Sequence, residues 1–437
     1  MFVWLREGKA TLKEKLADVA DIDVTVLPYN RSVLGLIENA REEGRHVVLA
    51  TATHRTLAER IAEHLGCFDE VISTDKGTNL SAHQKQVRLT ERFGEGGFDY
   101  VGNSRDDLVV WQSARSAIVV NPEQGVERLA RHSGNVTEVI ETRPEQLKAW
   151  MKALRLHQWM KNLLVFVPLL ASHSLTDISL LLDGLLAFVF FGICASSVYL
   201  LNDLVDLNDD RHHVTKKDRP FAAGAIPIKL GLLVFPALLL LAFVGAWLLL
   251  PIEFLGVLLV YYVLTLGYSF WLKRFMAVDV IALASLYTVR IIAGAAALSL
   301  PLTFWILGFS IFIFLSLALV KRYAELHEAR QKGKKDRARG RGYYPSDLEM
   351  ISSLGASAGY MAVMVLALYI QDDATRVLYS QPEIIWLACP VLLFWVTRVW
   401  LLTHRGKMHD DPVIFAVKDK VSLLTGALLG IIFFIAT

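Results

Sequence analysis

The chain of 437 residues combines 54% hydrophobic side chains with only 20% charged ones, and its mean hydropathy of +0.41 is higher than that of ordinary soluble domains. This composition excludes a disordered chain, a collagen or disulfide scaffold and a wholly soluble enzyme. The 45 Lys and Arg against 43 Asp and Glu give a net charge of +2, so we expect no nucleic-acid partner.

The first third of the chain, Met1 to about Leu147, alternates short β-branched runs with amphipathic helical stretches. Helical periodicity that stops at a glycine predicts helices at 55–66 and 83–94. Apolar runs of strand length predict parallel strands at 47–51, 70–74, 100–102 and 117–121. Residues 1–147 are therefore expected to form one α/β domain.

From His157 onward the sequence consists of apolar stretches long enough to cross a bilayer, which takes about 20 helical residues. The uncharged stretch Ile291–Val320 contains Pro301, which predicts two helices joined by a tight turn. We expect about nine spans, at 160–176, 181–201, 228–250, 252–272, 277–300, 302–320, 350–371, 383–402 and 421–437. Residues 148–437 are thus predicted to be a multi-pass, all-α membrane bundle.

Lys and Arg collect in every second connection between these spans, and the opposite connections almost lack them. The basic connections hold Arg211, Lys216, Lys217, Arg219, Lys273, Arg274, the segment 321–341, Arg405, Lys407, Lys418 and Lys420. Positive charge marks the cytoplasmic side of membrane proteins. We therefore expect a protein of the cytoplasmic membrane, with its N-terminal domain and basic loops in the cytoplasm.

A cluster of carboxylates follows the second span. Asn202, Asp206 and Asp210 are spaced i, i+4, i+8, with Asp203 beside them, so a helix would place them on one face at the membrane boundary. Mg²⁺ prefers hard oxygen ligands and is usually shared between carboxylates and substrate phosphates. Arg211, Lys216, Lys217 and Arg219 come next and can bind phosphate oxygens. The segment suits a diphosphate leaving group; the alternative is a solvated juxtamembrane loop.

This segment resembles the first aspartate-rich motif, NDxxDxxxD, of the UbiA superfamily of intramembrane prenyltransferases, and every position of the motif matches. The resemblance covers about residues 150–437 and implies a nine-helix bundle that opens to the cytoplasm. It also implies that Asn202, Asp203, Asp206 and Asp210 hold Mg²⁺, with Asp203, Asp206 and Asp210 as the catalytic residues.

Within the superfamily, three features resemble the decaprenyl-phosphate phosphoribosyltransferase branch. The opening of the first helix matches at Gln158, Trp159, Lys161 and Asn162. The pattern DRxHPxKxxRP matches at Asp210, Arg211, His213, Lys216, Arg219 and Pro220, with Val214 in place of proline. Prenyl-diphosphate users carry a second DxxxD motif after the sixth helix, and here that position reads Lys321 to Glu325, KRYAE. The second carboxylate cluster is therefore missing.

Further polar residues lie near or inside the helices. Tyr268 and Lys273 are similar to a donor-binding Tyr and Lys pair of the superfamily, with one residue more between them; an interfacial tyrosine and a snorkelling lysine are the alternative. Asp279 and Arg290 are eleven residues apart and are predicted to face the same way, as an ion pair or as a phosphate contact. The predicted substrate-binding residues are Lys161, Asn162, Arg211, Lys216, Arg219, Tyr268, Lys273, Arg290, Lys321 and Arg322. His409, Asp410 and Asp411 remain without a role.

The reaction implied is attack by the phosphate of a polyprenyl phosphate on the anomeric carbon of phosphoribosyl diphosphate, with diphosphate leaving. A phosphate monoester is already anionic near neutral pH, so no strong general base is needed. One alternative is prenyl transfer from a polyprenyl diphosphate to an aromatic acceptor. A second is a lipid-binding or scaffold membrane protein without catalytic activity.

The N-terminal region resembles a haloacid dehalogenase domain. Thr51, Lys85 and the segment Gly102–Asp107 match three of its motifs, although Asn103 replaces one aspartate. The nucleophile motif DxDxT is spelled by Asp21 to Thr25, but an amphipathic, charged stretch precedes it instead of a buried strand. We therefore expect the domain to lack its nucleophile, the chain beginning just after it, and to have no phosphatase activity.

Overall fold

The computed structural model describes residues 22–437, except 76–79, 133–134, 334–335, 337–340, 373–378 and 409–410. Asp21, His409 and Asp410 lie outside the described residues. The chain divides into two compact units. The N-terminal unit comprises Met1–Trp150 and Asp206–Ile226, and the bundle unit comprises Met151–Val205 and Pro227–Thr437.

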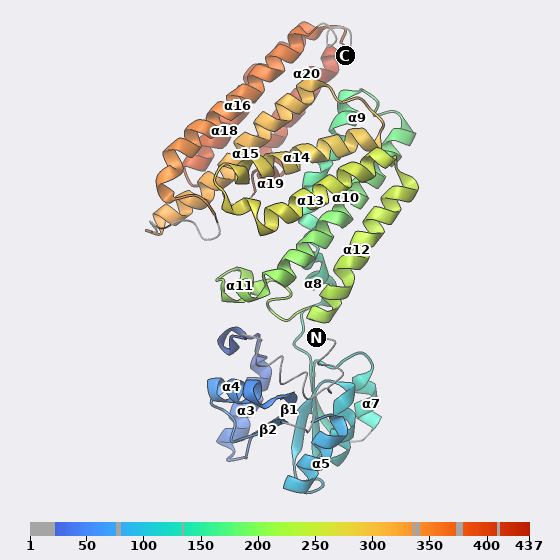
Figure 1. Cartoon of the computed structure of the whole chain (residues 1–437), viewed down its shortest axis with the longest axis vertical. Coiled ribbons are helices and arrows are strands. Elements are labelled where there is room, and N and C mark those ends of the chain that lie inside the picture. Colours follow the sequence, from blue (N-terminus) through green and yellow to red (C-terminus); the bar gives the residue numbers. More distant parts are fainter. Residues whose placement is uncertain are drawn as a thin grey trace. The chain divides into compact units, whose positions relative to one another are not determined.

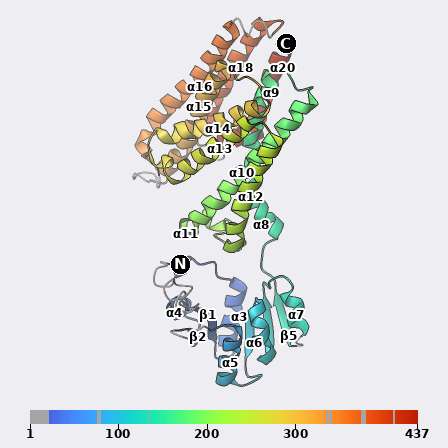
Figure 2. The same ribbon diagram turned by 45° about the vertical axis from the view of Figure 1, so that its right-hand side comes forward.

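Within its described residues, the N-terminal unit contains five strands, all paired in parallel, in two sheets (Figures 1 and 2). β1 (Val48–His54) pairs with β2 (Glu70–Thr74). The second sheet has the order β3 (Asp99–Gly102), β4 (Ser116–Val120), β5 (Val136–Ile140). The first four strands confirm the prediction within a few residues, whereas β5 was not predicted.

The described part of this unit also contains helices and short 3₁₀ turns. They are α3 (Arg31–Glu42), α4 (Arg55–Leu65), α5 (Ala82–Phe93), α6 (Leu108–Ser113), α7 (Val126–His132) and α11 (Leu207–His212), with the 3₁₀ turns η1 (Val24–Val26), η2 (Arg105–Asp107) and η4 (Lys216–Asp218). α4 ends as predicted at Gly66, whose φ of 60° lies in the left-handed region that favours glycine. Helix α8 (Gln146–Ala153) contains the boundary between the units.

The bundle unit consists of long apolar helices. They are α10 (Ile178–Val205), α12 (Ile228–Leu249), α13 (Ile252–Phe270), α14 (Val278–Ala297), α15 (Phe304–Gln331), α16 (Leu348–Gln371), α18 (Ala388–His404) and α20 (Lys420–Ala436). Shorter elements are η3 (Leu156–Phe166), α9 (Val167–Ala171), η5 (Leu272–Arg274), η6 (Pro345–Asp347), η7 (Pro382–Leu387) and α19 (Pro412–Lys418). The turn predicted at Pro301 is confirmed, since it separates α14 from α15.

Among the described residues, seven helices are long and apolar enough to span a membrane, or eight if α19 and α20, bent by 79°, count as one span. The span expected at 160–176 is not one long helix. It is the 3₁₀ helix η3 followed by the five-residue α9, because Pro168 stands in the first turn of α9 and cannot continue a preceding helix.

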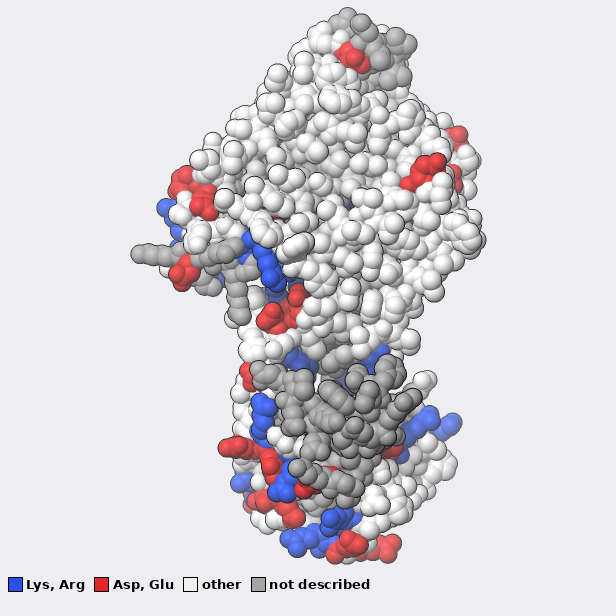
Figure 3. Space-filling model, viewed as in Figure 1, with Lys and Arg blue, Asp and Glu red and all other residues white. Residues whose placement is uncertain are grey.

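The outer surface of the bundle unit is strongly apolar. Leu233, Leu240, Trp247 and Phe434 are all more than 60% exposed, and much of the surface visible in Figure 3 is uncharged. A soluble domain rarely exposes so much contiguous apolar surface. The length and hydropathy of the helices give the reason: the bundle is a multi-pass membrane domain.

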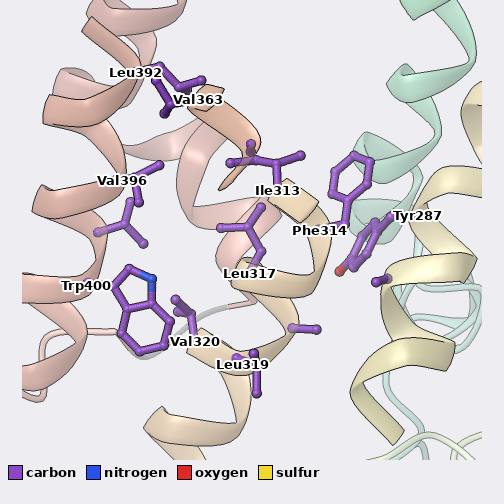
Figure 4. Close-up of a cluster of buried hydrophobic side chains, with 14 of the residues drawn as sticks. Tyr287, Ile313, Phe314, Leu317, Leu319, Val320, Val363, Leu392, Val396 and Trp400 are labelled. Atoms are coloured by element: carbon purple, nitrogen blue, oxygen red, sulfur yellow. The ribbon is translucent and has the colours of Figure 1, made fainter. Parts of the chain in front are cut away.

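One hydrophobic core joins α14, α15, α16 and α18 (Figure 4). Gly355 of α16 allows this packing, since a Cβ there would lie 2.0 Å from the ring of Trp400. Small residues commonly permit such close helix crossings in membranes. At one edge of the core, the ring of Tyr287 stacks on Phe314 with their centroids 5.1 Å apart.

Helix α14 is the most buried of the seven candidate spans, and η3 lies directly against it. A Cβ on Gly294 would come 2.0 Å from the backbone oxygen of Val165. Arg290 precedes Gly294 by one helical turn and therefore faces η3 as well. The glycine thus lets the backbone of η3 approach the polar face of α14.

Gly294→Ala is expected to destabilise the protein by about 1–3 kcal/mol, because the added methyl group must push η3 away from α14. The measurement is the midpoint of unfolding in detergent. Gly256→Ala is the matched control, since nothing lies within 4 Å of a Cβ at that position of α13. Equal midpoints for the two variants would contradict the close approach.

Candidate active site

The first half of the aspartate-rich motif lies on the last turn of α10. Asn202 donates its side-chain N–H to the Ser269 hydroxyl at 3.0 Å. Asp203 is 2% exposed and accepts a hydrogen bond from Arg155 at 2.5 Å. The guanidinium of Arg155 also lies over the ring of Tyr199. This aspartate is therefore held by a cation of the same unit.

The second half of the motif belongs to the N-terminal unit. The continuous helix expected from the spacing is interrupted, because α10 ends at Val205 and Asp206 is the N-cap of α11. Asp210 is 1% exposed and accepts from Arg219 at 2.6 Å. In the part of the chain that the structure describes, the half-buried Asp206 side chain has no hydrogen-bond or ion-pair partner.

Three further cations were predicted to bind substrate phosphates, two of them in the loop after the motif. Arg211 donates from Nε to the backbone oxygen of Ala222 at 3.4 Å, and Lys216 is exposed on η4. In the bundle unit, Lys273 lies half-buried on η5. These three cations remain predictions as phosphate contacts.

The oxygen ligands of the motif fit Mg²⁺ in their chemistry, as hard donors on a short stretch of chain. Among the described residues, no three His, Cys, Asp or Glu side chains are gathered closely enough to hold a metal ion. Asp203 and Asp210 are instead paired with Arg155 and Arg219. Among the described residues, Asp206 is the one aspartate of the three without a paired cation that a metal ion would have to displace.

A first buried polar cluster surrounds Asp279. We call Tyr268, Asp279, Arg322, Glu325 and Arg341 the Asp279 cluster. The carboxylate of Asp279 is 0% exposed and accepts hydrogen bonds from Tyr268 at 2.9 Å, from Arg341 at 3.0 Å and from Arg322. Arg322 also pairs with Glu325. Two arginines and two carboxylates balance each other, as a buried structural network requires.

The predicted pair of Asp279 with Arg290 is wrong. Eleven helical residues separate their Cα atoms by about 16 Å along the axis, so a shared face does not bring the side chains together. Asp279 instead contacts Arg322 of α15, and Arg290 contacts η3. Tyr268 and Arg322, both predicted to bind substrate, instead bind Asp279 in this structure. Their role in substrate binding stays a prediction.

A second buried polar cluster surrounds Asp411, and we call Lys161, Tyr287, Lys321 and Asp411 the Asp411 cluster. The Asp411 carboxylate accepts from Lys161 at 2.7 Å, from Tyr287 at 3.1 Å and from Lys321 at 3.3 Å. Burial alone would raise the pKa of Asp411, but the charges of Lys321 and Lys161 outweigh it and lower this pKa. Asp411 is thus ionised and binds both lysines.

Asn162 and Arg290 adjoin this cluster. Arg290 donates from Nε to the side-chain oxygen of Asn162 at 3.1 Å, and its guanidinium lies 5.7 Å from the ring centroid of Tyr287. The amide nitrogen of Asn162 is buried and has no hydrogen-bond partner. Because arginine can only donate, it fixes the oxygen of Asn162 and leaves the amide N–H groups without an acceptor.

Sequence reasoning placed Lys161, Asn162, Arg290 and Lys321 at a site but gave Asp411 no role. The sequence around Asp411 indicates only the start of a helix, because an Asp directly before a proline is typical of a helix N-cap. Asp411 is indeed the N-cap of α19, accepting from the Val413 backbone. Nothing in the sequence spacing could show that it meets residues of η3, α14 and α15.

Two motif residues of the N-terminal unit, Lys85 and Asp107, belong to one hydrogen-bond network. Lys85 donates to Tyr100 at 2.8 Å and to Asp107 at 3.2 Å. The other carboxylate oxygen of Asp107 accepts from the backbones of Asn103 and Ser104. Burial would raise the pKa of Asp107, but the hydrogen bonds from Ser104 and Asn103 and the charge of Lys85 lower it. Thr51 lies on β1 and bonds to Thr53.

Comparison with known proteins agrees with both halves of this architecture. The pattern of the UbiA prenyltransferase family matches residues 163–433, and that of the haloacid dehalogenase-like hydrolases matches residues 4–109. A protein of Sinorhizobium fredii is 39% identical over 99% of this chain and 84% of its own length.

Two further similarities cover the bundle. The decaprenyl-phosphate phosphoribosyltransferase of Mycobacterium tuberculosis is 38% identical over 65% of this chain and 93% of its own length. A solved UbiA homologue from Archaeoglobus fulgidus, bound to DMAPP and Mg²⁺, is 16% identical with a TM-score of 0.49, covering 65% of this chain and 97% of that one. The chain is a membrane transferase that belongs to the UbiA prenyltransferase family and carries a haloacid dehalogenase-like domain at its N-terminal end.

Proposed function

We propose that the protein transfers phosphoribose from phosphoribosyl diphosphate to a polyprenyl phosphate. The observation that carries this proposal is the cation excess inside the bundle. Lys161 and Lys321 both contact one carboxylate, Asp411, and Arg290 lies against the ring of Tyr287, which also binds Asp411. Lys321 begins the segment where prenyl-diphosphate users have their second carboxylate motif. The identity with the phosphoribosyltransferase of M. tuberculosis adds support.

We assign Mg²⁺ to Asn202, Asp203, Asp206 and Asp210. When bound, the ion would neutralise charge on the departing diphosphate. Arg155 and Arg219 hold two of these carboxylates before substrate binds. Arg211 and Lys216 supply cations for diphosphate oxygens from the same loop, and Lys273 from η5.

The polyprenyl phosphate is an anion before it reacts, so the residues of the chain need not remove a proton from it. Their contribution is to orient the phosphate and to stabilise charge. Buried cations act strongly in this role because the surrounding helices exclude water. Tyr268 and Arg322, through Asp279, connect α13, α14 and α15.

The test uses the full chain in detergent with Mg²⁺ and labelled phosphoribosyl diphosphate, with and without a polyprenyl phosphate, followed by extraction into organic solvent. Label in the lipid phase that requires the polyprenyl phosphate is the expected result. No label, together with a product from a polyprenyl diphosphate and an aromatic acid, would assign the protein to aromatic prenyl transfer. No metal-dependent turnover with either pair would favour a lipid-binding role.

We place the bundle in the cytoplasmic membrane, with the N-terminal unit and the basic loops on the cytoplasmic side. The asymmetry of Lys and Arg between alternate loops supports this orientation. A cysteine introduced at Lys217, which is exposed, is expected to react with a membrane-impermeant maleimide in inverted vesicles and not in intact cells.

We also propose that residues 1–147 form a domain without phosphatase activity. Asp23 of the DxDxT-like segment caps η1 through Thr25, and the resulting hydrogen bonds lower its pKa to about 2. Asp107 is fully engaged by Lys85, Tyr100 and Ser104. The full chain is expected to show no Mg²⁺-dependent hydrolysis of p-nitrophenyl phosphate. Hydrolysis that disappears in Asp21→Ala would contradict this.

A further inference from the structure

The Asp411 cluster and its neighbours contain more positive than negative charge. Lys161 is 8% exposed and Arg290 is 5% exposed, and Lys321 is partly buried beside them. The two lysines share one carboxylate, Asp411, and no carboxylate contacts Arg290 among the residues that the structure describes. Buried charge of one sign is costly unless it is paired. The site therefore favours an additional anion.

The buried amide of Asn162 points to the same ligand chemistry. Asn162 is 1% exposed, and its amide nitrogen is one of three buried side-chain atoms without a partner in the described chain. An unsatisfied buried donor costs roughly 1–3 kcal/mol. Its oxygen is already used by Arg290. An anion that accepts from this amide would satisfy the donor and the cations together.

We propose that Lys161, Lys321, Arg290 and the Asn162 amide form the binding site for the phosphate monoester of the lipid acceptor, and that Asp411 is the resident counter-ion which the phosphate replaces. This assignment rests on the proposed function. Asp411 bridges both lysines, at 2.7 and 3.3 Å. A phosphate carries more negative charge and more acceptor oxygens than this carboxylate, so it can bind the same groups.

The surroundings favour a lipid headgroup over the phosphate of the sugar donor. The guanidinium of Arg290 lies over the rings of Phe191, Tyr261 and Tyr287, with centroids 5.1 to 5.7 Å away. Tyr287 in turn stacks on Phe314 in the apolar core. Cations set among rings inside a membrane bundle suit an anion attached to a hydrocarbon chain.

The counter-ion lies on a short element of the bundle unit. Asp411 does not come from one of the long helices but from the N-cap of the seven-residue α19, which precedes the 79° bend to α20. Its Oδ1 atom also accepts from the backbone of Val413. When phosphate binds Lys161 and Lys321, the Asp411 carboxylate loses its contacts with them but keeps its hydrogen bond to the Val413 backbone at the N-terminus of α19.

The test measures binding without turnover. The full chain in detergent, with EDTA and without phosphoribosyl diphosphate, is titrated with farnesyl phosphate, farnesol or ribose 5-phosphate, and the melting temperature gives the apparent affinity. The wild type is expected to prefer farnesyl phosphate to farnesol. Lys161→Met is expected to weaken the binding of farnesyl phosphate at least tenfold and to leave the affinity for farnesol unchanged. Asp411→Asn is expected to increase the affinity for farnesyl phosphate at least threefold.

Lys332→Met is the matched control, since Lys332 is exposed at the C-cap of the same helix that carries Lys321; it is expected to bind as the wild type does. If Lys161→Met does not fold, Asn162→Asp replaces it. The new carboxylate still accepts from Arg290 but repels phosphate, so weaker farnesyl phosphate binding is expected. Weaker binding in Asp411→Asn would overturn the counter-ion role.

Two further outcomes would overturn the lipid assignment. One is an unchanged preference for farnesyl phosphate over farnesol in Lys161→Met and Asn162→Asp. The other is an effect of these variants on ribose 5-phosphate alone. Because neither donor nor metal is present, these results are independent of the transfer assay. Retained phosphate preference in a protein that transfers no phosphoribose would defeat the proposed reaction and leave the anion site in place.

Discussion

Asp206→Ala is expected to lower phosphoribosyl transfer at least about a hundredfold, which corresponds to roughly 2.7 kcal/mol of transition-state stabilisation, without lowering the melting temperature. The aspartate is assigned to the metal that neutralises the leaving diphosphate. Its side chain has no protein partner in the described structure, so its removal breaks no ion pair. Activity and stability are therefore separable at this position.

The same reasoning identifies the less informative variants. Asp203→Ala removes the carboxylate that Arg155 contacts, and Asp210→Ala removes the one that Arg219 contacts. Loss of turnover in either variant would mix a metal effect with a local rearrangement. Asp209→Ala is the control for Asp206→Ala, since Asp209 is an exposed residue of the same short helix. Full turnover in Asp206→Ala would remove the metal assignment.

Asp279→Ala is expected to have the largest effect on stability, about 3–5 kcal/mol. The substitution leaves Arg322, which is 1% exposed, with Glu325 as its one remaining carboxylate partner among the described residues, and it also removes the acceptor of Tyr268 and Arg341. Unfolding in mixed detergent micelles, followed by tryptophan fluorescence, measures the difference. Asp279→Asn keeps the shape and loses only the charge, so it should fall between Asp279→Ala and the wild type.

An exposed ion pair provides the contrast. Arg330 and Glu349 approach to 2.8 Å, yet their side chains are 57% and 71% exposed. Water and ions screen such a pair. Glu349→Ala is expected to change the unfolding midpoint very little. If it cost as much as Asp279→Ala, burial would not be what makes the Asp279 cluster important.

The spans were predictable from the sequence because length and hydropathy alone identify a membrane helix. α10, α12 and α20 match their predicted ranges within a few residues. β5 was missed because its sequence, VTEVI, is short and carries two polar residues. The first span was misjudged because hydropathy does not register that Pro168 starts a new helix.

The partners of the site residues were harder to predict than the residues themselves. Helical spacing showed that Asp279 and Arg290 share a face, but it gives no information on which neighbouring helix each one meets. Asp411 is more than 80 residues from Lys321 in sequence and meets it only through the packing of α19 against α15. A charge that pairs through tertiary structure leaves no periodic signal.

Tyr287 has a consequence for how variants of this protein are interpreted. Its ring packs on Phe314 in the hydrophobic core (Figure 4). Its hydroxyl donates to Asp411 at the polar site. A change of volume at Phe314 therefore shifts a hydrogen-bond donor of the site without touching a ligand. In a genetic screen, such a core substitution would be scored as a change in apparent substrate affinity, although the altered side chain lies in the hydrophobic core of the bundle.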